Sequence, residues 1–97
     1  MATSTQVSVA QSLAEIRIWD FDYNSDLNEG VTVASATATH IPPSGAAATP
    51  TVGTIVNGVV PVMIGPLAVM GQHYLSCLAT YSNGEKSEIR ILFLVNF

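Results

Sequence analysis

The sequence contains few charged residues. Aspartate, glutamate, lysine and arginine make up 10% of the 97 residues, against about a quarter in an ordinary soluble domain. The cations are Arg17, Lys86 and Arg90, and the net charge is −4. These three cations form no basic stripe that could neutralise a run of phosphates, so we expect no nucleic-acid partner. A surface so poor in charge indicates cover by other subunits, because protein interfaces are depleted of charged groups at their centres. A soluble β domain coated with Ser and Thr is the alternative.

Cysteine is almost absent. Cys77 is the one cysteine of the chain, which excludes a disulfide within it. We interpret Cys77 as a buried structural thiol in the middle of a strand. The stability of the fold must therefore come from packing, from strand pairing or from neighbouring chains.

The sequence lacks a membrane-spanning segment and a signal peptide. No stretch reaches the roughly 18 apolar residues of a membrane span, since the apolar run 59–70 is interrupted by Pro61, Gly65 and Pro66. The first five residues have neither the basic region nor the apolar stretch of a signal peptide. We expect no membrane partner, and we expect a cytosolic product or one that is assembled in a cytosol and released later.

The C-terminal residues carry a strong strand pattern. From Lys86 to Asn96 the side chains alternate, with one almost fully apolar face, and a period of two indicates a β-strand. This strand is preceded by a second alternating run, Gln72–Tyr81, and by Ser82-Asn83-Gly84. Asn-Gly favours a two-residue hairpin turn because both positions tolerate positive φ. The apolar face comprises Ile89, Ile91, Phe93 and Val95, and we expect Leu92 and Leu94 on the other face to be covered by a partner or by loops.

The remaining segments also predict short strands. They are Leu13–Tyr23, Val31–Ile41, Thr51–Val56 and Val59–Ile64, the last two joined by Asn57-Gly58. In the first of them Trp19 and Phe21 break the parity of Ile16 and Ile18, which suggests a bulge or a strand that is buried on both sides. Turn signals recur about every 8 to 12 residues, and no segment has a helical period. This pattern predicts an all-β fold. The architecture that fits it is an antiparallel immunoglobulin-like β-sandwich of six to seven short strands. A small barrel is the alternative. Residues 13–97 form the predicted domain, and residues 1–12 are a flexible arm or an edge strand.

Oxygen ligands alternate at the end of the first predicted strand, as they do at the start of a calcium loop. The positions where an EF-hand needs Gly and a bidentate Glu hold Ser25 and Val31 instead. We expect the acidic residues to lie on a solvated strand face and the others to form turns, with a looser calcium site as the alternative. The residues are Asp20, Asp22, Asn24 and Asp26.

The sequence shows no constellation for catalysis. His40 and His73 have no zinc-ligand spacing, and we interpret His40 as a partly exposed strand residue, with a pH-sensitive contact to a neighbour as the alternative. Ser76 and Cys77 follow His73 closely, but a strand spreads such side chains apart. No nucleophile motif or phosphate loop is present. We predict a protein that is not an enzyme, with no catalytic, cofactor-binding or metal-binding residues and no cofactors.

Two aromatic residues are given structural roles. Gly71-x-x-Tyr74 at a strand entrance is typical of a tyrosine pinned at a sandwich corner, its hydroxyl bonded to upstream backbone. Trp19 is expected to be the largest core side chain, with its indole N–H on a carbonyl. An exposed Trp19 acting as a binding anchor is the alternative.

Five segments stand out together: Tyr23-x-x-Asp26-Leu27, Glu29-Gly30-Val31-Thr32-Val33-Ala34-Ser35, Gly71-x-x-Tyr74, Ala79-Thr80 and Ser82-Asn83-Gly84. With these segments the chain resembles the small immunoglobulin-like structural proteins of tailed bacteriophages. The resemblance covers roughly residues 20–96 and implies a subunit that joins tail and fibre or decorates the head or tail. It implies a location in the virion after assembly in the bacterial host cytoplasm, with other virion proteins and copies of itself as partners.

The segments expected to contact such partners are poor in charge. They are Val31–Ile41, the arm of residues 1–12 and the apolar loop Gly65–Gly71. An arm of this composition can add a strand to a neighbouring sheet. The alternative function is a carbohydrate- or ligand-binding β-sandwich module.

Overall fold

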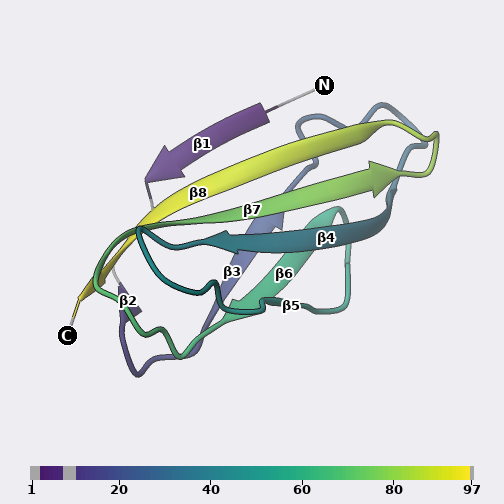
Figure 1. Ribbon diagram of the computed structural model, residues 1–97. Coiled ribbons are helices and arrows are strands. Elements are labelled where there is room, and N and C mark those ends of the chain that lie inside the picture. The colour runs from purple at the N-terminus through teal and green to yellow at the C-terminus, as the bar shows by residue number, and fades with distance from the viewer. Residues whose placement is uncertain (1–2, 8–10, 97) are drawn as a thin grey trace.

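Every regular element in the described part of the chain is a β-strand (Figure 1). The structure is a computed structural model that describes residues 3–7 and 11–96. Of residues 3–7 it describes the backbone. The strands are β1 (Thr3–Val7), β2 (Gln11–Ser12), β3 (Arg17–Asp22), β4 (Val33–Ile41), β5 (Thr51–Val52), β6 (Val59–Ile64), β7 (Gly71–Tyr81) and β8 (Lys86–Asn96).

The strands form two sheets that pack face to face. The larger sheet has the order β1-β8-β7-β4, with β2 also paired to β8, and the smaller sheet has the order β3-β6-β5. Figure 1 shows the smaller sheet behind the larger one. The expected all-β sandwich is therefore confirmed, with eight strands in the described residues where six to seven were predicted.

The strand pairing is not antiparallel throughout. Both β1 and β2 run parallel to β8, with Thr3 opposite Glu88 and Gln11 opposite Val95. The strands from β3 onward pair antiparallel. β1 and β2 thus both belong to the larger sheet. We predicted that residues 1–12 are a flexible arm or an edge strand, and the described residues among them form strands.

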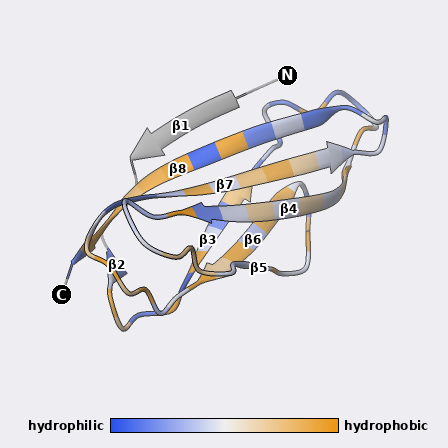
Figure 2. Cartoon of the chain, viewed as in Figure 1, coloured by the Kyte–Doolittle hydropathy of each residue, from blue (hydrophilic) through white to orange (hydrophobic). Residues whose placement is uncertain are grey.

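The predicted C-terminal hairpin is confirmed. β7 and β8 pair from Gly71 opposite Val95 to Thr80 opposite Lys86, and the alternation of apolar and polar residues is visible along β8 in Figure 2. The turn differs from the expected two-residue type. Gly84 N–H donates to the Tyr81 carbonyl and Tyr81 N–H to the Glu85 carbonyl, and of Asn83 and Gly84 only the glycine has positive φ. This is a three-residue loop that ends in a left-handed glycine.

The second Asn-Gly pair does form the tight turn expected of it. Asn57 and Gly58 both have positive φ, at 50° and 76°. Val56 and Val59 exchange both backbone hydrogen bonds across the turn, at 3.1 and 2.9 Å. Because this geometry needs two left-handed residues, Asn-Gly suits it well.

Both alternatives predicted for the first long strand, a bulge and burial on both sides, are wrong. β3 pairs with β6 without a register shift. Trp19 and Phe21 have the inward parity, whereas Ile16 and Ile18 are exposed. An irregularity occurs instead in β4, where the register with β7 shifts between Val33 and Ser35.

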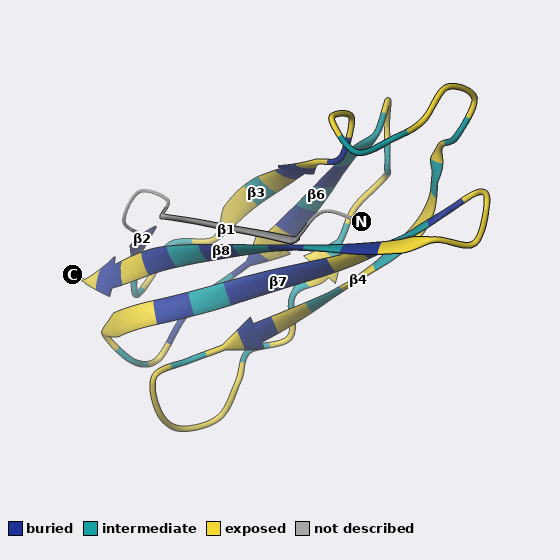
Figure 3. Ribbon diagram, turned by 90° about the horizontal axis from the view of Figure 1, so that it is seen from above, coloured by how far each residue is buried: buried dark blue, intermediate teal, exposed yellow. Residues whose placement is uncertain are grey.

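The core lies between the two sheets. Figure 3 shows buried positions alternating with more exposed ones along β7 and β8. The predicted apolar face of β8 is buried, and Phe93 is fully enclosed against Trp19 of the smaller sheet, with ring centroids 5.8 Å apart. A hydrogen bond of 2.6 Å from the Tyr23 hydroxyl to the Cys77 carbonyl also crosses the core.

Candidate functional site

The outer face of the smaller sheet carries an exposed apolar patch. Ile18 of β3 lies opposite Met63 of β6, and Met63 lies opposite Thr51 of β5. Ile16 is 59% exposed, Ile18 61% and Met63 41%. Because these side chains point away from the core, they do not contribute to its packing. We call Ile16, Ile18, Pro61 and Met63 the outer apolar patch.

A shallow hollow lies within this patch. It has a volume of about 130 Å³ and is lined by Ile18, Thr51, Gly53, Pro61 and Met63. Asp20 lies opposite Pro61 in the strand register, and Asp22 lies two residues further along β3. Both acidic side chains are exposed. The face is therefore apolar at one end and acidic at the other.

The outer face of the larger sheet is more polar. Arg90 lies over the Tyr74 ring, 5.8 Å from its centroid, and 3.8 Å from Glu88, which also accepts a hydrogen bond from Ser76. Tyr74 therefore faces outward, and its predicted role, pinned at a sandwich corner with its hydroxyl bonded to upstream backbone, is wrong. Of the two leucines predicted to need cover, Leu92 is half-buried and Leu94 is 45% exposed.

The segments expected to contact partners differ in exposure. β4 pairs with β7 on one side, and in the described part of the chain no strand pairs with its other edge. The loop Gly65–Gly71 is only partly available, because Leu67 is buried in the core and Met70 is exposed. Within residues 1–12, Gln11 is fully buried.

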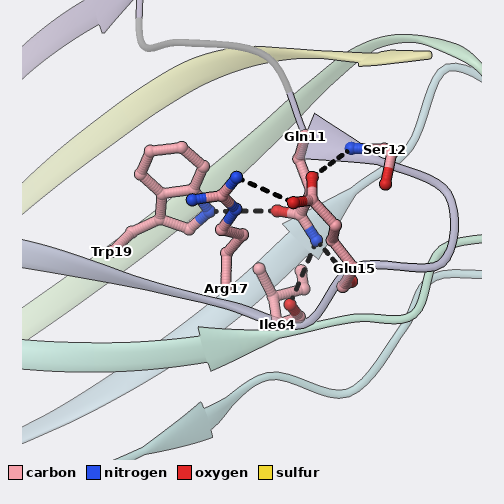
Figure 4. A network of polar contacts seen from close by, with 6 residues as sticks. All are labelled: Gln11, Ser12, Glu15, Arg17, Trp19 and Ile64. Atoms are coloured by element: carbon pink, nitrogen blue, oxygen red, sulfur yellow. Dashed lines mark hydrogen bonds and ion pairs between the residues drawn. The ribbon is translucent and has the colours of Figure 1, made fainter. Parts of the chain in front are cut away.

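Gln11 joins the two sheets through a buried polar network (Figure 4). Its Nε2 donates to the carbonyls of Glu15 and Ile64, at 2.9 and 3.2 Å. Its Oε1 accepts from the Trp19 indole N–H at 3.3 Å. A buried amide is stable where its polar atoms are paired. Since β2 pairs with β8, this network connects the larger sheet to β3 and β6.

Glu15 extends the network to the surface. It accepts from Ser12 N–H at 2.8 Å and from Arg17 at 2.7 Å. The Ser12 hydrogen bond, followed by the Arg17 contact, lowers the pKa of the Glu15 carboxyl. These contacts hold the segment from which Ile16 and Ile18 project. Gln11 thus positions one side of the outer apolar patch.

Replacing Gln11 by alanine should lower the free energy of unfolding by about 2–3 kcal/mol, because the indole N–H and a buried carbonyl lose their partners. Urea unfolding followed by the fluorescence of Trp19, the single tryptophan, measures the change. Gln72→Ala is the matched control, because Gln72 is exposed, and it should cost less than about 1 kcal/mol. Equal losses in the two variants would contradict the role given to Gln11.

Trp19 and Cys77 lie close to their predicted places. Trp19 is half-buried against the core, and its N–H bonds to the side-chain carbonyl of Gln11. It is not the largest core residue, because Tyr23 and Phe21 are the largest fully buried side chains. Cys77 is fully buried as predicted, and burial raises the pKa of its thiol.

Residues 24–26 form a turn after β3 as predicted, but the side chain that bonds the nearby backbone there is that of Asp22, which was predicted to lie on the solvated strand face. The Asp22 carboxylate accepts from both the backbone N–H and the side-chain amide of Asn24, at 2.9 and 2.8 Å. Asp26 accepts from the Tyr81 hydroxyl at 2.7 Å. That bond comes second to burial in raising the pKa of the Tyr81 phenol. Among the described residues, no three His, Cys, Asp or Glu side chains are grouped to hold a metal ion.

The two histidines lie together, which the spacing did not predict. Both are buried, and His40 Nε2 lies 2.8 Å from His73 Nδ1. His40 is therefore not the partly exposed residue that we expected. Strand parity was the available signal, because His40 shares a face with Ala36 and Ala38.

Comparisons with known proteins yield only distant structural likenesses. No family model and no curated sequence matches the chain. A 2,6-sialyltransferase of a Photobacterium species has 8% identity and a TM-score of 0.48, and the match covers 98% of this chain and 17% of that one. Listeria monocytogenes InlP has 15% identity and a TM-score of 0.48, with 95% and 26% covered. The chain thus spans about a quarter or less of each, and neither likeness carries an argument about function. No helix in the described residues is long and apolar enough to cross a membrane.

Proposed function

We propose that this protein is a non-enzymatic structural subunit of a tailed-phage virion, an adaptor or decoration that docks through its outer apolar patch. The observation that carries the proposal is the exposure of Ile16, Ile18 and Met63 on one sheet face. Exposed apolar groups gathered on one face are typical of protein contacts. The low charge of the chain supports the same conclusion. The phage assignment itself rests on the sequence resemblance.

The charge around the patch favours a different virion protein over a second copy of this chain. Asp20 and Asp22 continue the patch along β3. The cations Arg17 and Arg90 are already close to Glu15 and Glu88. Lys86 is the remaining cation of a second copy, and it lies at the β7–β8 hairpin of the larger sheet and not beside the outer apolar patch. A partner with lysine or arginine beside an apolar surface complements both ends of this face. Repeated copies then occupy equivalent sites on a symmetric particle.

Ile18→Lys should weaken docking about ten- to a hundredfold, because burying one such side chain contributes about 1.5–3 kcal/mol. The measurement is cosedimentation of the purified protein with particles of the phage whose genome encodes it. Leu94→Lys is the control, since Leu94 is an exposed apolar residue on the outer face of the other sheet. An equal loss in both variants, or unchanged binding in both, argues against the patch. The absence of any binding to the particles overturns the virion proposal.

The carbohydrate-binding alternative has one observation in its favour. A polar pocket of about 170 Å³ is lined by Asp26, Asn28, Tyr81, Glu85 and Lys86. This volume is below the roughly 300 Å³ at which ordinary ligand sites begin. A glycan array with saturable binding that Tyr81→Phe abolishes, while the fold is retained, would favour this alternative.

A further inference from the structure

His40 and His73 form a continuous hydrogen-bonded chain at one end of the sandwich. The backbone N–H of Ala48 donates to His40 Nδ1 at 2.8 Å. His40 Nε2 lies 2.8 Å from His73 Nδ1, and His73 Nε2 lies 2.7 Å from the Val69 carbonyl. The two ring planes differ by 11°. Two imidazoles therefore connect a fixed donor at one end to a fixed acceptor at the other.

The two ends determine the position of every proton in this chain. Ala48 N–H requires His40 Nδ1 to be an acceptor, so a neutral His40 carries its hydrogen on Nε2 and donates to His73 Nδ1. His73 must then carry its hydrogen on Nε2 and donate to the Val69 carbonyl. Both rings are neutral in this arrangement. An added proton on His40 Nδ1 would face the Ala48 N–H, and one on His73 Nδ1 would face the Nε2–H of His40. In either case two hydrogen-bond donors point at each other.

The connections and the inward strand faces around the pair hold no charged group that compensates for such a proton. In the smaller sheet, the charged residues of β3 are Arg17, Asp20 and Asp22, which are exposed, and β5 and β6 have none. Segments 42–50 and 65–70, which the chain connects, contain no titratable side chain. The residues opposite the two histidines in the strand register are apolar: Leu75 lies opposite His40, and Phe93 lies opposite His73. His73 packs on Phe93, with ring centroids 5.5 Å apart. The nearest inward titratable residue of β7 is Cys77, whose thiol has a pKa raised by burial and stays neutral. The other inward residues of β7 and β8 near this end are Leu75, Ile91 and Val95.

The chain fastens two connections to the ends of β4 and β7. Ala48 belongs to the β4–β5 connection and Val69 to the β6–β7 connection, and Figure 1 shows both at the same end of the sandwich. These connections also lie against each other, since a Cβ on Gly45 would lie 3.9 Å from Val69. The β6–β7 connection has a separate attachment through Leu67 N–H, which donates to the Leu13 carbonyl at 2.8 Å. Breaking the histidine chain therefore releases the residues near Ala48 and Val69 and leaves Leu67 in place.

We propose that the histidine pair is a pH-sensitive lock that holds these two connections closed while both rings are neutral and releases them when either ring is protonated. The device is independent of the docking proposed for the outer apolar patch, which lies on the other sheet. It needs no metal or ligand, because the backbone groups of Ala48 and Val69 set the polarity of the chain.

The direction of the pH effect follows from the proton count. Burial, and secondarily the neighbouring His73, lower the pKa of His40 below its ordinary 6.5. A group with a lowered folded-state pKa stabilises the fold above its unfolded-state value, and this stabilisation is lost as the pH falls toward the folded-state pKa. The lock is therefore fully closed above about pH 7 and weakens below pH 6.5. For each proton taken up on opening, the closed-to-open ratio falls by up to about tenfold per pH unit.

Nitrogen-15 NMR of the wild-type protein tests the lock directly, because His40 and His73 are the only histidines in the sequence. At pH 8 both rings should be neutral and carry hydrogen on Nε2. Between pH 8 and pH 5 the protection of the Ala48 amide, corrected for intrinsic exchange, should fall at least about tenfold. The control is the Tyr81 amide, which bonds to Glu85 at the hairpin end and should change by less than about twofold.

Three results would overturn the proposal. One is an Nδ1–H tautomer on either ring at pH 8. Another is protonation of His40 with no change in Ala48 protection. The last is an equal loss of protection at Ala48 and Tyr81, which indicates unfolding of the whole domain. Docking to phage particles is not part of this experiment, so its outcome is separate from that of the proposed function.

Discussion

Replacing Phe93 by alanine should lower the free energy of unfolding by about 3–5 kcal/mol. Phe93 is fully buried and contacts Trp19 of the opposite sheet as well as His73 of its own sheet. Its removal leaves a cavity where the two sheets meet, and truncations of buried aromatic residues cost this amount. Because a domain of this size is stable by about 5–15 kcal/mol in total, this loss is a large part of the stability and brings the variant close to unfolding if the wild type lies at the lower end of that range. Urea unfolding followed by circular dichroism gives the value.

The neighbouring residue provides the control. Leu94 lies on the opposite face of β8 and is 45% exposed, so Leu94→Ala should cost less than about 1 kcal/mol. The pair tests the strand assignment as well as the core, since side chains alternate between the faces of a strand. Similar losses in the two variants would show that β8 does not have the inward face described here.

The sequence predicted the larger sheet well because β7 and β8 follow local rules. An unbroken alternation fixed the inward face of β8, and the turn residues placed the hairpin between Tyr81 and Lys86. The type of turn was harder to predict, because Asn-Gly is compatible with both two-residue and three-residue loops. In the three-residue loop, the side-chain carbonyl of Asn83 accepts a hydrogen bond of 3.1 Å from the Glu85 N–H.

The first long strand was misread because hydrophobic residues were assumed to point inward. Ile16 and Ile18 are exposed, whereas Trp19 and Phe21 have the inward parity. Burial of apolar residues holds for cores but does not forbid exposed ones. The apparent break in parity was thus the signal of an apolar outer face. The candidate docking surface lies where the simple pattern failed.

The polar networks were not predictable because their partners are distant in the sequence. Gln11 bonds to a carbonyl 53 residues away, and His40 and His73 are 33 residues apart. Neither pair has a spacing that identifies a motif. Only the pairing of strands brings these residues together, so they follow from the topology and not from local sequence.

Gly65→Ala should destabilise the protein by about 3–5 kcal/mol, because an added methyl group meets backbone that is fixed by other contacts. A Cβ at Gly65 would lie 2.2 Å from the Glu15 carbonyl oxygen and 2.9 Å from Ile16 Cα. The same Glu15 carbonyl accepts from Gln11, so moving it away breaks the buried network. Gly65 also has φ of +128°, which side chains other than glycine adopt only with strain. Urea unfolding monitored by Trp19 fluorescence measures the loss.

Gly84→Ala separates the two contributions in that result. Gly84 also has positive φ, at +93°, but a Cβ there meets nothing within 4 Å. This control should therefore cost only the backbone term of about 1–2 kcal/mol. The excess loss in Gly65→Ala then measures how firmly the segment carrying Ile16 is held against the end of β6. If the two alanine variants lose the same stability, that segment yields easily, and the outer apolar patch is not the preformed surface on which the proposed docking depends.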